Sequence, residues 1–186
     1  AGEAEHQMKR PFTHSLAKLA ALVVVGAVLV LSACATSKGE GFAIYLTKQD
    51  VPPARMPVLS HVDIAEKPII AISDVNTYNA STHEMTLITS AYERISRLQV
   101  PTSGKSFVVC VDKKPIYWGA FWTLLSSASF AGVTIVQPLG SQDTKVVRLE
   151  LGYPSPSFYG GEAYGGPDPR LNAEVMKSLK LAGKLK

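Results

Sequence analysis

The chain has 186 residues, of which 46% are hydrophobic and 18% are charged, and its formal net charge is +4. This length predicts about one domain. The composition excludes a wholly disordered chain, a collagen-like repeat and a polytopic membrane protein. Because the positive excess is small, the sequence predicts no nucleic-acid partner.

The first feature along the chain is a short basic segment followed by an apolar run. The basic segment begins at Met8, and the run covers the 13 residues from Leu19 to Leu31. A membrane-spanning helix needs about 20 apolar residues, whereas the hydrophobic region of an export signal needs about 7 to 15. The pattern therefore predicts a signal peptide over residues 1–33, and a transmembrane anchor is the less favoured interpretation. Residues 1–7 precede the basic segment and are interpreted as extraneous.

The apolar run ends in Leu31-Ser32-Ala33-Cys34, which resembles the lipobox of bacterial lipoproteins. The resemblance implies cleavage after Ala33 and attachment of acyl chains such as palmitate to the sulfur of Cys34. An ordinary signal peptide with an accidental cysteine is the alternative. Since each buried methylene contributes about 0.8 kcal/mol, two or three acyl chains make release from a bilayer very slow. We therefore expect an extracytoplasmic protein that a lipid anchors to the outer membrane or to the outer face of the cytoplasmic membrane.

Residues 34–41 are small and polar and predict a short lipidated tether, and residues 42–186 predict one folded domain. Within this domain, eight short segments rich in apolar and β-branched residues are typical of strands. These segments are 42–46, 68–72, 75–78, 84–88, 106–111, 116–122, 133–137 and 145–151. Residues 112–115 predict a hairpin turn between two of them.

Two segments predict helices. The first begins at Thr89 or Ser90 and ends near Leu98, with Ser90 and Glu93 at the spacing of a capping box. The second begins after Asp168, with a proline at its first position. Its apolar stripe comprises Leu171, Val175, Leu179 and Ala182, and Gly183 is the expected stop. The pattern as a whole predicts an α+β fold with one mainly antiparallel sheet and two packed helices.

The string VVCVDKKPIYWGAFW begins at Val108, and SSASF, GYPSP and DPR follow farther along the chain. With these motifs the chain resembles an uncharacterised family of small exported proteins of bacteria and archaea, over roughly residues 63–186. The resemblance supplies no catalytic residue. A fainter similarity, over residues 85–98, 108–112 and 115–118, exists to the periplasmic head region of the SecD translocation subunit and concerns the fold alone.

The sequence lacks the motifs of the common cofactor, metal and nucleophile sites. Gly104-Lys105-Ser106 has no upstream glycine of a phosphate-binding loop, and no paired cysteines, His-Glu-x-x-His or Gly-x-Ser-x-Gly occur. We therefore expect no cofactor and no metal, and we assign no catalytic residue. Cys110 stands between two valines and predicts a buried, unreactive thiol.

Aromatic residues are concentrated in two segments. By strand alternation, Trp118 and Trp122 share one face of their strand, and Tyr117 and Phe121 share the other. Either core packing or a partly exposed groove for a peptide or glycan accounts for them. The Gly- and Pro-rich residues 152–169 form either a recognition loop or a surface wrap. The candidate recognition residues are Trp118, Trp122, Tyr153, Phe158, Tyr159 and Tyr164.

These observations favour a lipid-anchored, non-enzymatic binding module of the cell envelope, with a protein, peptide or envelope polymer as partner. A structural spacer is compatible with the same features. The alternative is an envelope hydrolase or transferase with an unfamiliar Asp/Ser/His site. That alternative requires at least two side chains from a set of six to converge in one pocket. The six are His61, Asp63, Asp74, His83, Asp112 and Ser127.

Overall fold

The computed structural model describes residues 2, 39–140, 142–159 and 166–186. Residues Gly39–Lys186 form a compact unit of their own, which contains every strand, helix and core residue given below. The predicted signal peptide, the predicted lipidation site Cys34 and most of the predicted tether lie outside the described residues. Among the described residues, no helix is long and apolar enough to cross a membrane.

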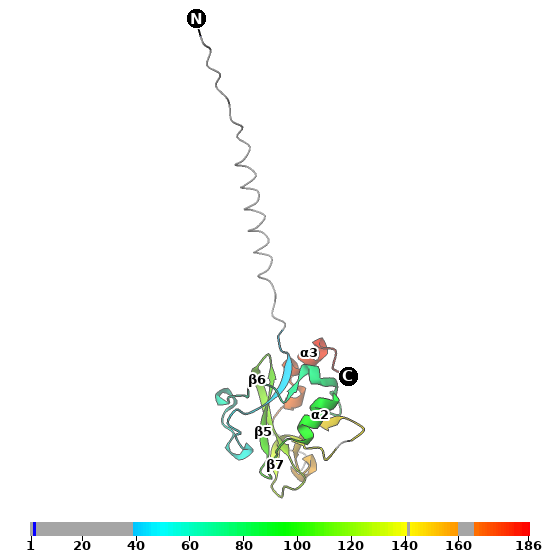
Figure 1. The fold of residues 1–186 in the computed structure, drawn as a ribbon. Coiled ribbons are helices and arrows are strands. Elements are labelled where there is room, and N and C mark those ends of the chain that lie inside the picture. The colour runs from blue at the N-terminus through cyan, green and yellow to red at the C-terminus, as the bar shows by residue number, and fades with distance from the viewer. Residues whose placement is uncertain (1, 3–38, 141, 160–165) are drawn as a thin grey trace. The chain divides into compact units, whose positions relative to one another are not determined.

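Six strands form a large sheet in the order β2-β1-β5-β6-β7-β9 (Figure 1). Their bounds are β1 Phe42–Leu46, β2 Ile70–Ala71, β5 Lys105–Val111, β6 Lys114–Trp122, β7 Phe130–Val136 and β9 Glu150–Tyr153. All neighbouring pairs are antiparallel except β6 and β7, which are parallel. These two strands therefore end at the same edge of the sheet, with Trp122 opposite Val136.

A small antiparallel sheet has the order β3-β4-β8. Its strands are β3 Val75–Asn79, β4 Glu84–Leu87 and β8 Val146–Arg148. The single strand predicted over residues 145–151 is thus divided between the two sheets, and Leu149 is the crossing point. The Leu149 N–H donates to the His83 carbonyl oxygen at 3.0 Å, and its side chain is buried in the core. This burial fixes the place where the chain changes sheets.

The β5–β6 hairpin has a shorter turn than predicted. Asp112 and Lys113 both adopt positive φ, 52° and 64°, and β6 already begins at Lys114. Two left-handed residues are typical of the two-residue turn whose twist matches that of antiparallel strands. Pro115 therefore belongs to the strand, opposite Cys110.

Helix α2 covers Thr89–Ser96, but the predicted capping box does not form. The residue before the helix is Ile88, whose side chain offers no cap. The Ile88 N–H donates to the Asp74 carbonyl oxygen at 2.9 Å. Since strand β4 ends at Leu87 and the helix begins at Thr89, Ser90 falls inside the first turn.

The C-terminal helix also begins later than predicted. Asp168 caps a short 3-10 helix, η5 Pro169–Leu171, by accepting from the Arg170 N–H. Asn172 then caps α3, Ala173–Leu181, by accepting from two backbone N–H groups. Leu171 consequently precedes the helix and is 51% exposed, whereas Val175 and Leu179 are buried.

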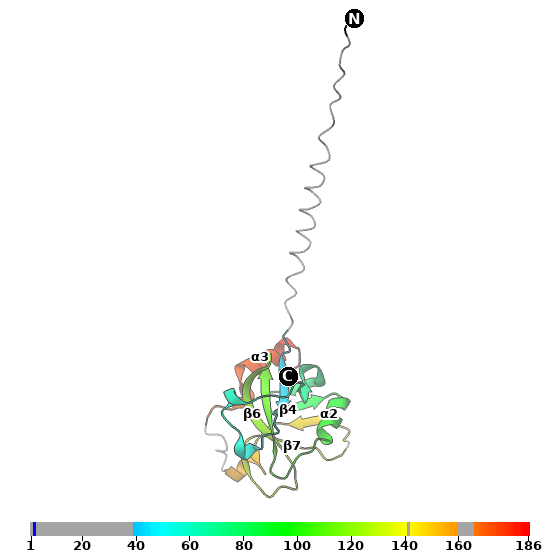
Figure 2. The same cartoon turned by 60° about the vertical axis from the view of Figure 1, so that its left-hand side comes forward.

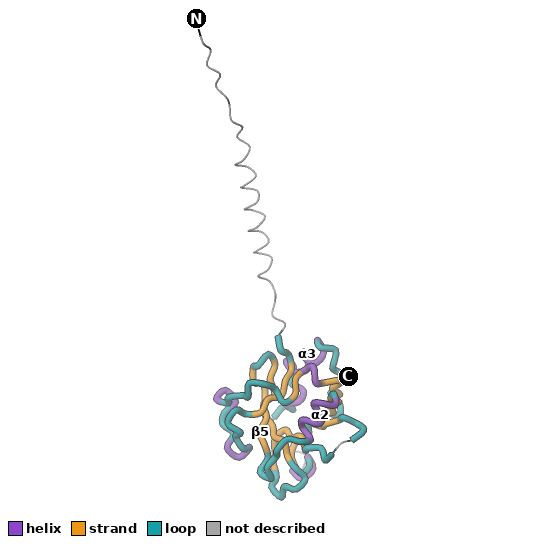
Figure 3. The backbone as a smooth tube through the Cα atoms, in the orientation of Figure 1, coloured by secondary structure: helices purple, strands orange, loops and turns teal. Residues whose placement is uncertain are grey.

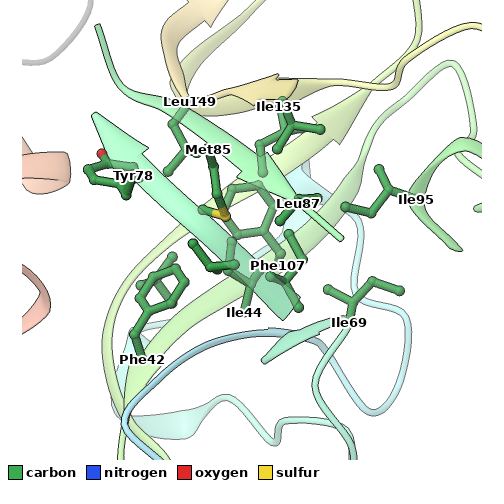
Figure 4. Packing of buried hydrophobic residues seen from close by; sticks show 14 of the residues in the cluster. Phe42, Ile44, Ile69, Tyr78, Met85, Leu87, Ile95, Phe107, Ile135 and Leu149 are labelled. Carbon is green, nitrogen blue, oxygen red and sulfur yellow. The ribbon is translucent and has the colours of Figure 1, made fainter. Parts of the chain in front are cut away.

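The main core contains residues of both sheets and of α2 and α3. Figures 2 and 3 show the two helices beside the strands. Phe42, Ile44 and Phe107 from the large sheet meet Met85 and Leu87 from the small sheet (Figure 4). The predicted α+β class, with two helices and mainly antiparallel strands, is confirmed, although the strands form two sheets.

The opposite face of the large sheet is covered as well. Residues of 56–64, which contain the 3-10 helix η2 Leu59–His61, pack on Tyr45 and Cys110. Cys110 is fully buried, and burial, with a smaller contribution from the charge of Glu40, raises the pKa of its thiol to about 12. The predicted burial of this cysteine is confirmed.

Candidate functional site at the end of the parallel strands

The candidate site lies at the edge where β6 and β7 end together. The loop after β6 presents Leu124 and Leu125, which are 60% and 85% exposed, and the segment after β7 presents Leu139, which is 66% exposed. The Gln137 N–H donates to the Trp122 carbonyl oxygen at 2.8 Å and holds the two segments side by side. We call the end of the body that carries these three exposed leucines the leucine end.

The leucine end belongs to an unusually uncharged part of the sequence. Residues 115–142 are 28 consecutive residues without Lys, Arg, Asp or Glu, where the average composition would place about five. On the neighbouring strand, Lys105 lies opposite Phe121 and forms an ion pair with Asp50. Three exposed leucines at the ends of two neighbouring strands, in an uncharged stretch of sequence, make this end a candidate surface for binding another molecule.

Aromatic rings pack beneath this surface. Trp122 and Phe130 stack with their ring centroids 5.3 Å apart, and Tyr153 lies 5.5 Å from Trp122. The hydroxyl of Tyr153 donates to the Thr123 carbonyl oxygen at 3.0 Å. Phe130 also contacts Trp118, at 5.6 Å between centroids. The rings therefore support the loop that carries Leu124 and Leu125.

The predicted recognition residues are thus distributed between interior and surface. Trp122 and Tyr153 are buried, at 3% and 5% exposure, and act in packing. Trp118 is half-buried and Phe158 is 62% exposed. The side chain of Tyr159, and the whole of Tyr164, lie outside what the structure describes.

The predicted alternation along β6 is confirmed. Tyr117 and Phe121 join the main core, and Trp118 and Trp122 lie on the other face of the sheet.

The six side chains required for the enzymatic alternative are held apart. Asp63 accepts from Gln49 at 3.1 Å, and Asp74 pairs with Arg94 at 2.5 Å. Asp112 accepts from the backbone N–H of the residue that precedes β1. Across the described ranges, no hydrogen bond or ion pair joins any two of the six.

Acid–base groups converge instead where the β3–β4 turn meets the segment before α3. The Tyr78 hydroxyl lies 3.1 Å from His83 Nδ1, and His83 Nε2 lies 3.7 Å from Asp168 Oδ2. Arg170 donates to both oxygens of Asp168, from Nε to Oδ1 at 3.0 Å and from Nη2 to Oδ2 at 2.7 Å. Its Nη1 donates to the Leu149 carbonyl oxygen at 2.8 Å. We call the side chains of Tyr78, His83, Asp168 and Arg170 the Arg170 cluster.

The electrostatics of the Arg170 cluster follow from burial and from one charge pair. Burial raises the pKa of Tyr78 to about 12. Burial also lowers the pKa of His83, and the positive charge of Arg170 adds to this effect against the opposing charge of Asp168. Burial alone would raise the pKa of Asp168, but the hydrogen bonds from Arg170 outweigh it and hold this pKa below its usual value. The cluster therefore contains a neutral phenol, a neutral imidazole and a charged pair near pH 7, and it joins the small sheet to the C-terminal segment.

The lowered pKa of His83 predicts that acid destabilises the fold. Below the unfolded pKa of about 6.5, the unfolded chain binds a proton at this position more readily than the folded chain does. The free energy of unfolding should therefore fall as pH decreases from 7 toward 5. His83→Asn, which suits the φ of 55°, should flatten this part of the pH profile. Denaturant unfolding at several pH values measures it, with exposed His61→Asn as the control. A profile of His83→Asn equal to that of the unaltered protein would contradict the prediction.

A shallow groove of about 560 Å³ lies along the small sheet and the start of α2. Two of its polar side chains already have partners, since Asn76 donates to the Leu87 carbonyl oxygen, and Lys145 donates to the Gln142 carbonyl oxygen and lies over the Tyr92 ring. No group of three or more His, Cys, Asp or Glu side chains in the described ranges could hold a metal ion. The leucine end is therefore the stronger candidate.

Sequence reasoning did not identify the leucines, Phe130 or Arg170 as parts of these sites. The uncharged run was a signal that could have pointed to the leucine end. Comparison of the chain with protein families, with curated proteins and with solved structures finds no match. The resemblances that the sequence suggests therefore stay predictions.

Proposed function

We propose that this protein is a lipid-anchored, non-enzymatic binding module of the cell envelope, whose leucine end binds an apolar, uncharged segment of another envelope protein. The observation that carries the proposal is the exposure of Leu124, Leu125 and Leu139 on one edge of the sheet. Leucine side chains at 60% to 85% exposure lose contact with water when an apolar partner covers them, and burial of this kind drives most protein association.

The placement of the leucine end supports the proposal. Strand β1 begins beside the β5–β6 turn, because the Gly41 N–H donates to Asp112 Oδ1 at 2.7 Å. Strand β6 starts at that turn and ends at Trp122. Nine residues at about 3.3 Å each separate the two ends by about 30 Å. A tether that enters at β1 therefore leaves the leucine end free to meet a partner.

Photocrosslinking in the native envelope tests the partner. A photoreactive amino acid at Leu125 should give one reproducible protein adduct, and Leu124→Ser with Leu139→Ser should abolish it. Because both positions are exposed, these serine changes should alter the free energy of unfolding by no more than about 0.5 kcal/mol. The matched control is Val58, which is 70% exposed and lies outside the leucine end. The same adducts at both positions, or none at Leu125, would contradict a specific apolar partner.

The anchor has a separate test. Intact-mass analysis of the native protein should show a chain that begins at Cys34 and carries the mass of two or three acyl chains. A chain that continues upstream with an unmodified thiol would exclude this anchor.

A further inference from the structure

The end of the body where β1 begins is rich in lysine. Three segments meet there, since the Phe42 N–H donates to Ser178 Oγ of α3 at 2.8 Å, and Lys114 Nζ of the β5–β6 turn lies 3.2 Å from Glu174 of α3. Both views show α3 at the end of the body where the described chain begins (Figures 1 and 2). The lysines of the turn, of α3 and of the residues that follow α3 are Lys113, Lys114, Lys177, Lys180, Lys184 and Lys186. We call this surface the lysine end.

The acidic groups of the lysine end are already engaged. Asp112 accepts from the Gly41 N–H, Glu174 pairs with Lys114, and Glu40 accepts from the Tyr45 hydroxyl at 2.5 Å. Together these three carboxylates leave a positive excess among the six lysines.

Three exposed lysines account for this excess of positive charge. Lys113, Lys177 and Lys180 are exposed and form no ion pair with any described residue. Leu181, four residues after Lys177 on the same side of α3, is 80% exposed. The surface therefore combines unpaired positive charge with one projecting apolar side chain.

We propose that the lysine end docks on the anionic surface of a lipid bilayer. The inference rests on the proposed anchor at Cys34, because only four residues separate Cys34 from Gly39, where the described body begins. Even fully extended, the five steps from one to the other reach no more than about 18 Å. The hydrogen bonds of Gly41 and Phe42 fix the chain at the lysine end, so the tether brings this face to the bilayer.

The positive charge of the lysine end is complementary to an anionic membrane surface. Lysines near an anionic leaflet attract it within a Debye length, about 10 Å at 0.1 M salt, and a polybasic surface is a common second signal beside a lipid chain. Each lysine should raise the partition coefficient about fivefold, so that three unpaired lysines contribute about a hundredfold. The docked body would hold its leucine end away from the membrane.

The test uses residues 34–186 with Cys34→Ser, which lack acyl chains, and vesicles of phosphatidylcholine with or without one third phosphatidylglycerol. Cosedimentation at low salt should occur with the anionic vesicles alone and should disappear at high salt. Lys113→Gln with Lys177→Gln and Lys180→Gln should lower the partition coefficient about a hundredfold. The matched control removes the same charge from exposed residues outside the lysine end, through Lys48→Gln, Arg55→Gln and Lys67→Gln.

Equal losses in the two triple variants would overturn the proposal, because they would show an effect of net charge alone. Binding to a polyanion such as heparin without binding to anionic vesicles would overturn it too. A cooperative thermal transition for each variant shows that the folds compared are intact. Since no acyl chain is present, failure here leaves the intact-mass result for Cys34 unaffected, and the two proposals fail separately.

Discussion

Gly119→Ala should lower the free energy of unfolding by about 3 kcal/mol, the upper part of the range for overpacked cores. A Cβ atom at this position of β6 would meet the Phe107 ring at 2.5 Å and the Val133 carbonyl oxygen more closely still. The ring is fully buried and packs edge-to-face on Phe121, with the centroids 5.1 Å apart. Because the oxygen belongs to the neighbouring strand β7, relief of the clash requires the parallel pair to separate. Denaturant unfolding followed by circular dichroism measures the change.

The control for this prediction is Gly166→Ala. A Cβ atom there has no neighbour within 4 Å, and the expected change is below about 0.5 kcal/mol. If both variants were equally stable, β6 and β7 would not pack as closely as described. Gly119→Val extends the test, because its two further methyl groups should destabilise the protein more than alanine does.

Arg170→Met should lower the free energy of unfolding by about 2 to 4 kcal/mol. This loss is smaller than that for breaking a deeply buried ion pair, because the Asp168 side chain keeps 24% exposure. The change removes the guanidinium that donates to both oxygens of Asp168 and to the Leu149 carbonyl oxygen. The carboxylate would then remain charged in a half-buried place, beside an imidazole whose own pKa is lowered by burial. Thermal and denaturant unfolding at pH 7 measure the loss.

A second variant separates the charge from the packing. Asp168→Asn with Arg170→Met leaves no unpaired charge, so the double variant should be more stable than Arg170→Met alone. Non-additivity of this sign is expected for two groups in one network. Additive losses would instead show that Arg170 stabilises the fold through its aliphatic stem or its hydrogen bond to the Leu149 carbonyl oxygen, and not through Asp168.

Local patterns predicted most of the elements, because strand alternation and helical periodicity depend on neighbours in sequence. The segment 42–46 matches β1 at both ends, and the opposite faces of Trp118 and Trp122 against Tyr117 and Phe121 follow directly from alternation. Two of the errors have a common physical cause. The division at Leu149 and the missing side-chain cap at Ile88 both depend on partners that are distant in the sequence.

The candidate sites were harder to predict for the same reason. Leucine is a residue type that is usually buried in a core. The exposure of Leu124 and Leu125 depends on where two parallel strands end. The sequence suggested His83 as one of six residues of a possible Asp/Ser/His site and Asp168 as the residue before the last helix, and tertiary structure alone brings them to 3.7 Å.

The opposite placement of the β1 entry and the leucine end sets how the body responds to mechanical tension. A pull between Gly41 and Leu125 acts along the strands, because β1, β5 and β6 run between these two ends. Hydrogen bonds of antiparallel strands are perpendicular to the strand direction, so such a pull shears whole ladders at once and cannot open them one bond at a time. Force spectroscopy along this axis should therefore record a higher rupture force than a pull across the strands.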